Sequence, residues 1–439
     1  MKLSSIAWNA AGLGVPLVAA LAAIPPLLHT LGNERFGILS LAWGLTAIAG
    51  AFDLGIGRAA TRQLSDHLAH GRQANLLPTA RSAARLALFA GLSGGVLFAL
   101  AIGGGVYHWL SFSSELESQI ITAGLLLALT IPLQASIATY RGVSEACQRF
   151  RGINVIRMGI GVANFLFPLI AVQFTNHVDW LVGSLLASRV LAWFAYRHLA
   201  LSHLGSGNLS ETDAHNMKIE TASLVRSGGW LTVSAVVGPL LVQADRFFLA
   251  SQASVADVPT YTVPFDIVTQ LFLVVTAVST VAFPTIARII GTDPNLAWRL
   301  FREWSWRVTG AMALVASAAA LILPHVFPWW VGSTLSVESV LIGQILCIGL
   351  VTHSIGVMCF AFLHAAGRFR ATALINIAEI PFYFAALPWL IAAFGVKGAA
   401  VAWALRVTLD AAALYFLCAR EARTRSVAVS NSSFSQSQE

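Results

Sequence analysis

Charged residues are scarce in this chain. They make up 11% of its 439 residues, and hydrophobic residues make up 57%. An ordinary soluble domain carries about 25% charged residues, so this composition excludes a water-soluble globular protein. The length accommodates roughly twelve apolar spans of about 20 residues with short connections. The sequence therefore predicts an all-α polytopic membrane protein.

Motifs for metal binding, disulfides and nucleotide chemistry are also lacking. The cysteines Cys147, Cys347, Cys359 and Cys418 have no CxxC spacing, which argues against a metal site and a disulfide framework. There is no HExxH, P-loop or Rossmann fingerprint, so we expect no ATP hydrolysis, no catalytic site and no cofactor. A GxSxG pattern at 91–95 lies inside an apolar span, where it favours close helix packing over an esterase.

Twelve apolar runs predict the membrane spans. Their approximate bounds are 6–30, 36–57, 82–106, 118–140, 153–174, 178–200, 226–250, 259–287, 305–328, 337–363, 372–394 and 397–419.

Basic residues set the predicted topology. Nearly all of the 27 Lys and Arg residues fall in every second connection. Only Arg35 and Lys397 lie in the alternate connections, and Arg189, Arg246 and Arg406 lie inside spans. The positive-inside rule then places both termini in the cytoplasm. This placement favours membrane lipids over nucleic acid as the partner of the basic loops.

Internal similarity predicts two lobes. Gln148-Arg149-Phe150-Arg151 resembles Gly367-Arg368-Phe369-Arg370, and Arg189 matches Arg406 and Trp8 matches Trp230 at nearly the same offset. We predict an N-terminal six-helix lobe over 1–204, a cytoplasmic linker over 205–225, a C-terminal six-helix lobe over 226–420 and a disordered cytoplasmic tail over 421–439. Such parallel repeats are typical of transporters that bind substrate between their halves.

Charged residues inside the spans are the candidate cavity residues, because each is costly in hydrocarbon and needs a cavity or a partner. Arg189 and Arg406 occupy equivalent positions, and guanidinium groups suit phosphate oxygens. A helix-to-helix ion pair is the alternative, since Asp410 lies one turn from Arg406. The other candidates, each with a structural alternative, are Asp245, Arg246, Asp266 and Glu379. Glu379 is either a proton-coupling carboxylate or a partner for a neighbouring arginine.

The end of the second span carries a further group of charges. Asp53 ends the span, and Arg58, Arg62, Asp66 and His70 recur every four residues. If the helix continues, they form one stripe at the cytoplasmic mouth. The stripe is either an electrostatic lip for an anionic headgroup or a solvated face.

Several of these motifs resemble one family. The segments Leu31-Gly32-Asn33-Glu34-Arg35-Phe36-Gly37, Phe52-Asp53-Leu54-Gly55-Ile56-Gly57-Arg58 and Gln243-Ala244-Asp245-Arg246-Phe247-Phe248-Leu249 are similar to those of Wzx-type polysaccharide-biosynthesis flippases. This family belongs to the multidrug/oligosaccharidyl-lipid/polysaccharide (MOP) exporter superfamily.

The resemblance implies a MATE-like, V-shaped pair of lobes. Such a protein flips an undecaprenyl-pyrophosphate-linked oligosaccharide across the inner membrane by alternating access, for O-antigen or exopolysaccharide synthesis. The polymerase of the same pathway is an expected partner, and the coupling ion, H⁺ or Na⁺, stays open. The alternatives are an ion-coupled multidrug exporter of the same superfamily and a membrane polysaccharide polymerase or ligase. The first span lacks the carboxylate typical of multidrug extruders, and the outer connections are short for an enzyme.

Overall fold

A computed structural model describes residues 3–202, 204, 221, 237–332, 335 and 337–436, and this part of the chain contains helices and turns without strands. The chain forms two compact units, unit 1 (Met1–Val258) and unit 2 (Pro259–Glu439). The predicted linker, except residue 221, lies outside the described residues, as do 226–236 of the seventh span and Trp230.

The boundary between the units differs from the predicted lobe boundary. Unit 1 includes the helical residues 237–252, which we predicted for the second lobe. Contacts within unit 1 account for this. The backbone N–H of Ser111 donates to Ala250 O at 2.8 Å. A Cβ on Gly44 would lie 3.5 Å from the Arg246 side chain, so this helix packs closely on the first one.

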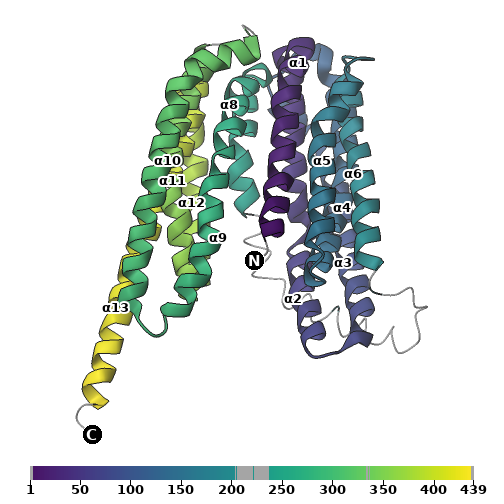
Figure 1. Ribbon diagram of the computed structural model, residues 1–439. Helices are drawn as coiled ribbons and strands as arrows, with labels where there is room; N and C mark the ends of the chain where they lie inside the picture. The colour runs from purple at the N-terminus through teal and green to yellow at the C-terminus, as the bar shows by residue number, and fades with distance from the viewer. Residues whose placement is uncertain are drawn as a thin grey trace. The chain divides into compact units, whose positions relative to one another are not determined.

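In unit 1, the helices α1 to α6 precede the helical residues 237–252 (Figure 1). The predicted first and second spans form one helix, interrupted only at Gly32, whose φ of 70° is accessible because glycine has no side chain. The helices are α1 (Leu3–Ala49), α2 (Ile56–Ala69), α3 (Leu76–Gly103), α4 (Glu117–Ala146), α5 (Phe150–Ala171) and α6 (Val178–Leu201).

The second span does not continue into α2, contrary to one predicted possibility. A 3₁₀ turn (Gly50–Asp53) follows α1, and Leu54 and Gly55 have positive φ. Asp53 stabilises the new helix start, because its carboxylate oxygens accept the N–H groups of Gly55 at 2.9 Å and Gly57 at 3.0 Å. The break separates the membrane-spanning helix from the amphipathic α2.

Glycines of the GxSxG pattern pack α3 against α4, as predicted. A Cβ on Gly91 would lie 2.6 Å from the Pro132 Cα, and one on Gly95 would lie 2.8 Å from the Ala128 carbonyl oxygen. Ser93 donates to its own helix at Phe89 O. This geometry is that of a helix contact rather than a nucleophile elbow.

Unit 2 contains α8 (Val258–Gln270), α9 (Phe272–Ile289), α10 (Pro294–Val331), α11 (Val337–Ala365), α12 (Phe369–Phe394) and α13 (Val396–Gln436). Helices α10 to α13 run side by side in Figure 1. The predicted eighth span is divided at Leu271 between α8 and α9.

Helix α13 continues through Gln436, so the predicted disordered tail begins as helix. Ion pairs and hydrogen bonds hold its first turn beyond the span. Glu421 accepts from Arg368 at 2.8 Å and from Arg425 at 2.7 Å, and Arg425 also donates to Ala366 O at 2.6 Å. These contacts attach this part of α13 to the α11–α12 turn.

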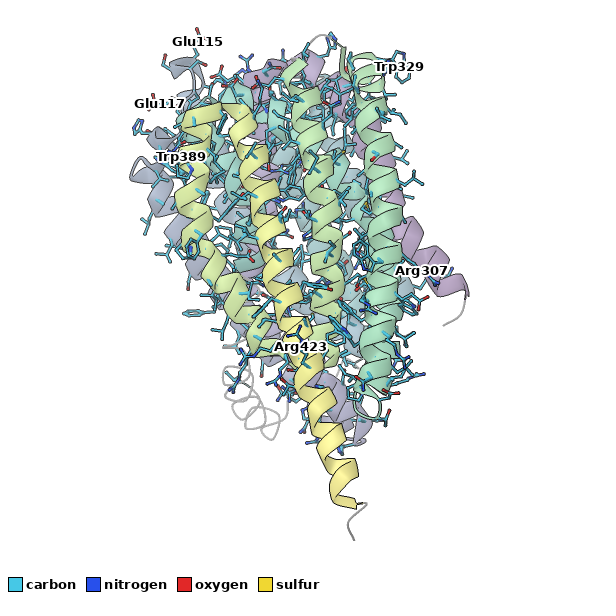
Figure 2. All side chains as sticks on the ribbon, turned by 90° about the vertical axis from the view of Figure 1, so that its left-hand side faces the viewer. Glu115, Glu117, Arg307, Trp329, Trp389 and Arg423 are labelled. Carbon is cyan, nitrogen blue, oxygen red and sulfur yellow. The ribbon has the colours of Figure 1, made fainter. Side chains whose placement is uncertain are left out.

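Nine helical segments within the described residues are long and apolar enough to cross a membrane. The segment Gly14–Asp53 covers most of the first two predicted spans. In unit 2, Trp329 and Trp389 lie toward one end of the helices, and Arg307 and Arg423 toward the other (Figure 2). This separation matches an aromatic interface on one side and a basic interface on the other.

Candidate functional site

Arg189 lies on α6 within unit 1 and is only 7% exposed. Its Nη2 donates to the side-chain oxygen of Asn164 on α5 at 2.6 Å. Trp43 Nε1 donates to the Asn164 carbonyl oxygen at 3.3 Å, and the Trp43 and Phe165 rings lie 5.1 Å apart. Arg189 forms no ion pair with any described residue. A buried cation is thus oriented by a neutral amide.

Arg406 lies on α13 within unit 2 and has carboxylate neighbours. Its Nη1 is 3.7 Å from Glu379 Oε2 on α12, and both side chains are largely buried. Asp410, one turn along α13, lines the same cavity as Glu379 and Arg406. The guanidinium carbon also lies 5.1 Å from the ring centroid of Tyr383, which is a cation–π distance. The sequence placed Asp410 one turn from Arg406, and the structure adds Glu379 as the ion-pair partner of this arginine.

These charges line a cavity of about 390 Å³ between α12 and α13. Glu379, Arg406 and Asp410 are its charged residues, and most of the remaining wall is apolar, including Phe382 and Leu409. Within the described part of the chain, Glu379 Oε1, Asp410 Oδ1 and Arg406 Nε are buried and make no hydrogen bond. The cavity can therefore offer both acceptors and a donor to a small ligand or a proton.

Equivalent turns precede the two arginine sites, as the repeat predicts. Arg149 before α5 has φ −84° and ψ 44°, and Arg368 before α12 has φ −87° and ψ 42°. Asn164 and Tyr383, which contact the two arginines, are separated by the same number of residues as Arg149 and Arg368. The sites are thus related positions with different chemistry.

The other predicted cavity residues divide between the units. Asp245 and Arg246 are buried within unit 1, where Arg246 packs close to Gly44 of α1. Asp266 is partly buried on α8 in unit 2. A shared role for Asp245, Arg246 and Asp266 stays a prediction.

The predicted mouth residues take different positions. Asp53 and Arg58 line a polar cavity of about 210 Å³ with Thr61 and Arg141. Arg62 does not line this cavity and is exposed on α2. Asp66 pairs with His70 at 3.2 Å and with Arg72 at 2.5 Å on the exposed surface. Asp53 is engaged by the backbone, which favours its structural role.

Sequence reasoning did not select Asn164, Tyr383 or His353. His353 on α11 is an electrostatic neighbour of Arg406, and its ring packs against Phe272 at 4.3 Å. All three are polar residues in apolar spans, but they carry no formal charge at neutral pH. A search for polar residues on the helix preceding each arginine would have found Asn164 and Tyr383.

Solved transporters share this fold. An inward-facing multidrug resistance MATE family transporter of the MOP superfamily aligns with a TM-score of 0.74 at 13% identity, covering 95% of this chain and 98% of that one. A MOP superfamily transporter from Pyrococcus furiosus aligns with a TM-score of 0.66 at 14% identity, covering 96% and 95%. The described residues hold no cluster of potential metal ligands. The fold is therefore that of multi-pass membrane transporters.

Sequence comparison defines the family. Residues 3–290 match the family model described as "Polysaccharide biosynthesis protein". The chain belongs to this family, as the sequence motifs suggested. It is also 27% identical over 421 residues to a Shigella flexneri protein named "Putative O-antigen transporter", covering 94% of this chain and 96% of that one.

Proposed function

We propose that the protein is a flippase for an undecaprenyl-pyrophosphate-linked oligosaccharide. It would act by alternating access in the bacterial inner membrane during O-antigen or exopolysaccharide synthesis, with both termini cytoplasmic. The polysaccharide family and the O-antigen relative support the substrate class. The MATE-like fold supports a transporter with two moving lobes.

The buried Arg189 is the structural observation that carries the proposal. A cation held by an amide rather than a carboxylate keeps its charge available for an anion. In a membrane such a residue is costly unless it serves a partner or a polar pathway. The pyrophosphate of a lipid-linked sugar provides the matching charge and bidentate acceptor geometry.

The Glu379–Asp410 pair is the proposed coupling site. Both carboxyl groups line the cavity beside Arg406, and Glu379 Oε1 and Asp410 Oδ1 are buried there without a hydrogen bond to the described part of the chain. Binding and release of a proton at these carboxyl groups would change the charge beside Arg406 and would couple a proton gradient to a change in unit 2. The same carboxylate-bearing apolar cavity also suits an organic cation, which is the observation favouring an ion-coupled multidrug exporter.

Deletion of the gene in its host separates these functions. We expect complete lipid-linked units to accumulate on the cytoplasmic leaflet, with loss of surface polysaccharide and identification of the glycan by mass spectrometry. Unchanged glycolipids with greater sensitivity to cationic drugs would instead identify a multidrug exporter. Units that reach the periplasmic leaflet but stay unpolymerised would contradict the flippase.

Complementation then tests the arginine. Arg189→Gln should fail to restore surface polysaccharide, since the amide cannot supply a charge, whereas Arg423→Gln on the exposed end of α13 should restore it. In the Arg189→Gln protein, the bound phosphate would lack its buried cation. We expect the binding free energy to weaken by about 2–5 kcal/mol, which is at least thirtyfold in substrate affinity. Full activity of an Arg189→Gln protein at wild-type abundance would disprove the role.

A further inference from the structure

A pocket lined by basic residues lies in unit 1, and Arg189 is not among its lining residues. It has a volume of about 730 Å³ and lies between the start of α5 and the end of α6. Arg149 and Arg151 line it from the α5 side, and His198 and Ser202 line it from the α6 side. No acidic residue is among its described lining residues.

The pocket has an apolar wall as well as a basic rim. Val155, Ile156 and Leu199 form part of its lining, and Val155 is 47% exposed. Gly152 allows the two helices to approach at its base, because a Cβ there would lie 2.7 Å from Leu199 Cδ1. A ligand that fits this surface has an anionic group and an adjoining hydrocarbon chain.

The repeat provides a comparison for the charge. The α11–α12 turn of unit 2 has the same backbone geometry, but its Arg368 is paired with Glu421 at 2.8 Å. In unit 1, Arg149 forms no ion pair with a described residue. The same backbone turn thus carries a paired arginine in unit 2 and, at Arg149 in unit 1, an arginine without an acidic partner among the described residues, which points to an external anion.

We propose that this pocket binds the phosphate headgroup of an anionic phospholipid from the surrounding bilayer. The phosphate would lie against Arg149 and Arg151, and an acyl chain would follow the exposed apolar surface of α5 and α6. Basic pockets between membrane helices at the basic interface are typical sites for such headgroups. This inference does not depend on the transported substrate.

Native mass spectrometry of the purified full-length protein tests the site. The probes are phosphatidylglycerol, cardiolipin, zwitterionic phosphatidylethanolamine and inorganic pyrophosphate. We expect the wild type to retain phosphatidylglycerol or cardiolipin in preference to phosphatidylethanolamine. The double variant Arg149→Gln/Arg151→Gln should bind the anionic lipid about tenfold more weakly.

Arg420→Gln/Arg423→Gln is the matched control, since it removes the same charge from exposed positions on α13 and should retain the lipid. If both double variants lost anionic-lipid binding equally, the loss would reflect net charge alone, and this result would overturn the site. Equal binding of anionic and zwitterionic lipids would overturn it as well. Preference for pyrophosphate over lipid would assign the pocket to soluble or substrate phosphates. Melting temperatures in detergent show whether each variant is folded.

Discussion

The two buried arginines occupy related positions, but one contacts a neutral amide and the other contacts a carboxylate. Arg189 in unit 1 is oriented by the neutral Asn164, while Arg406 in unit 2 lies beside Glu379 and shares a cavity with Glu379 and Asp410. The preceding turns share their backbone geometry. Helix geometry has therefore been kept in both halves, and the electrostatics has diverged.

The difference indicates a division of labour. An arginine beside a neutral amide keeps its positive charge for a ligand, whereas an arginine beside carboxyl groups belongs to a site of mixed charge. The α5 and α12 turns show the same contrast, since Glu421 neutralises only the second one. Unit 1 thus presents cationic sites, and unit 2 presents mixed ones.

Replacing each arginine by methionine tests this contrast most strongly. Arg406→Met leaves buried carboxyl groups without their cation and should cost about 3–5 kcal/mol of unfolding free energy. Arg189→Met leaves only a neutral amide and should cost about 1 kcal/mol. Unfolding in detergent micelles, followed by circular dichroism or thermal melting, measures both.

A double variant that also removes the carboxylate beside Arg406 provides the control. Adding Glu379→Gln to Arg406→Met should recover part of the loss, because it removes the charge that was left unpaired. Equal destabilisation by Arg189→Met and Arg406→Met would show that both arginines have the same structural role and would remove the contrast.

The sequence was sufficient to predict the membrane class, the family and the general position of the spans, because these depend on apolar length and on charge placement. It also located Arg189 and Arg406, since charged residues are conspicuous in apolar helices. Their partners were harder to predict. Whether Arg406 meets Glu379 or Asp410 depends on the rotation of α12 against α13, which a short motif does not specify.

Local breaks were also outside the reach of the sequence pattern. The apolar pattern predicted separate spans at 6–30 and 36–57, whereas the structure has one helix interrupted only at Gly32, which has positive φ. The sequence also allowed the second span to continue as a helix past Asp53. The structure has a break there, because Leu54 and Gly55 adopt positive φ, and α2 starts after it. The predicted tail is helical past Glu421 because ion pairs to Arg368 and Arg425 extend α13.

Removing Glu421 would leave the turn before α12 without its carboxylate, as in the turn before α5. Glu421→Ser leaves Arg368 and Arg425 without their buried partner, and should cost about 1.5–3 kcal/mol. Hydrogen exchange should increase in α13 beyond residue 421, and a second anionic lipid should bind. The control Glu303→Ser breaks only the exposed Arg307–Glu303 pair and should change stability by less than about 0.5 kcal/mol. Unchanged exchange in α13 would contradict this account.

The smallest predicted effect concerns the break in the second span. Unit 2 has a related break at Leu271, whose N–H donates to Val268 O at 3.1 Å, as Leu54 N–H donates to Ala51 O at 3.1 Å. Only the unit 1 break has a carboxylate cap, Asp53. Asp53→Ala should therefore cost about 1 kcal/mol, the usual contribution of a helix N-terminal cap, with transport reduced only as far as abundance falls.

Arg62→Gln on the exposed face of α2 is the comparison variant and should leave melting temperature and transport unchanged. Thermal melting in detergent and complementation of surface polysaccharide measure both variants. A stable Asp53→Ala protein that no longer transports would reverse the assignment, because a cap contributes only to stability. Asp53 would then act on substrate at the mouth of unit 1, and the carboxylate cap would be its secondary role.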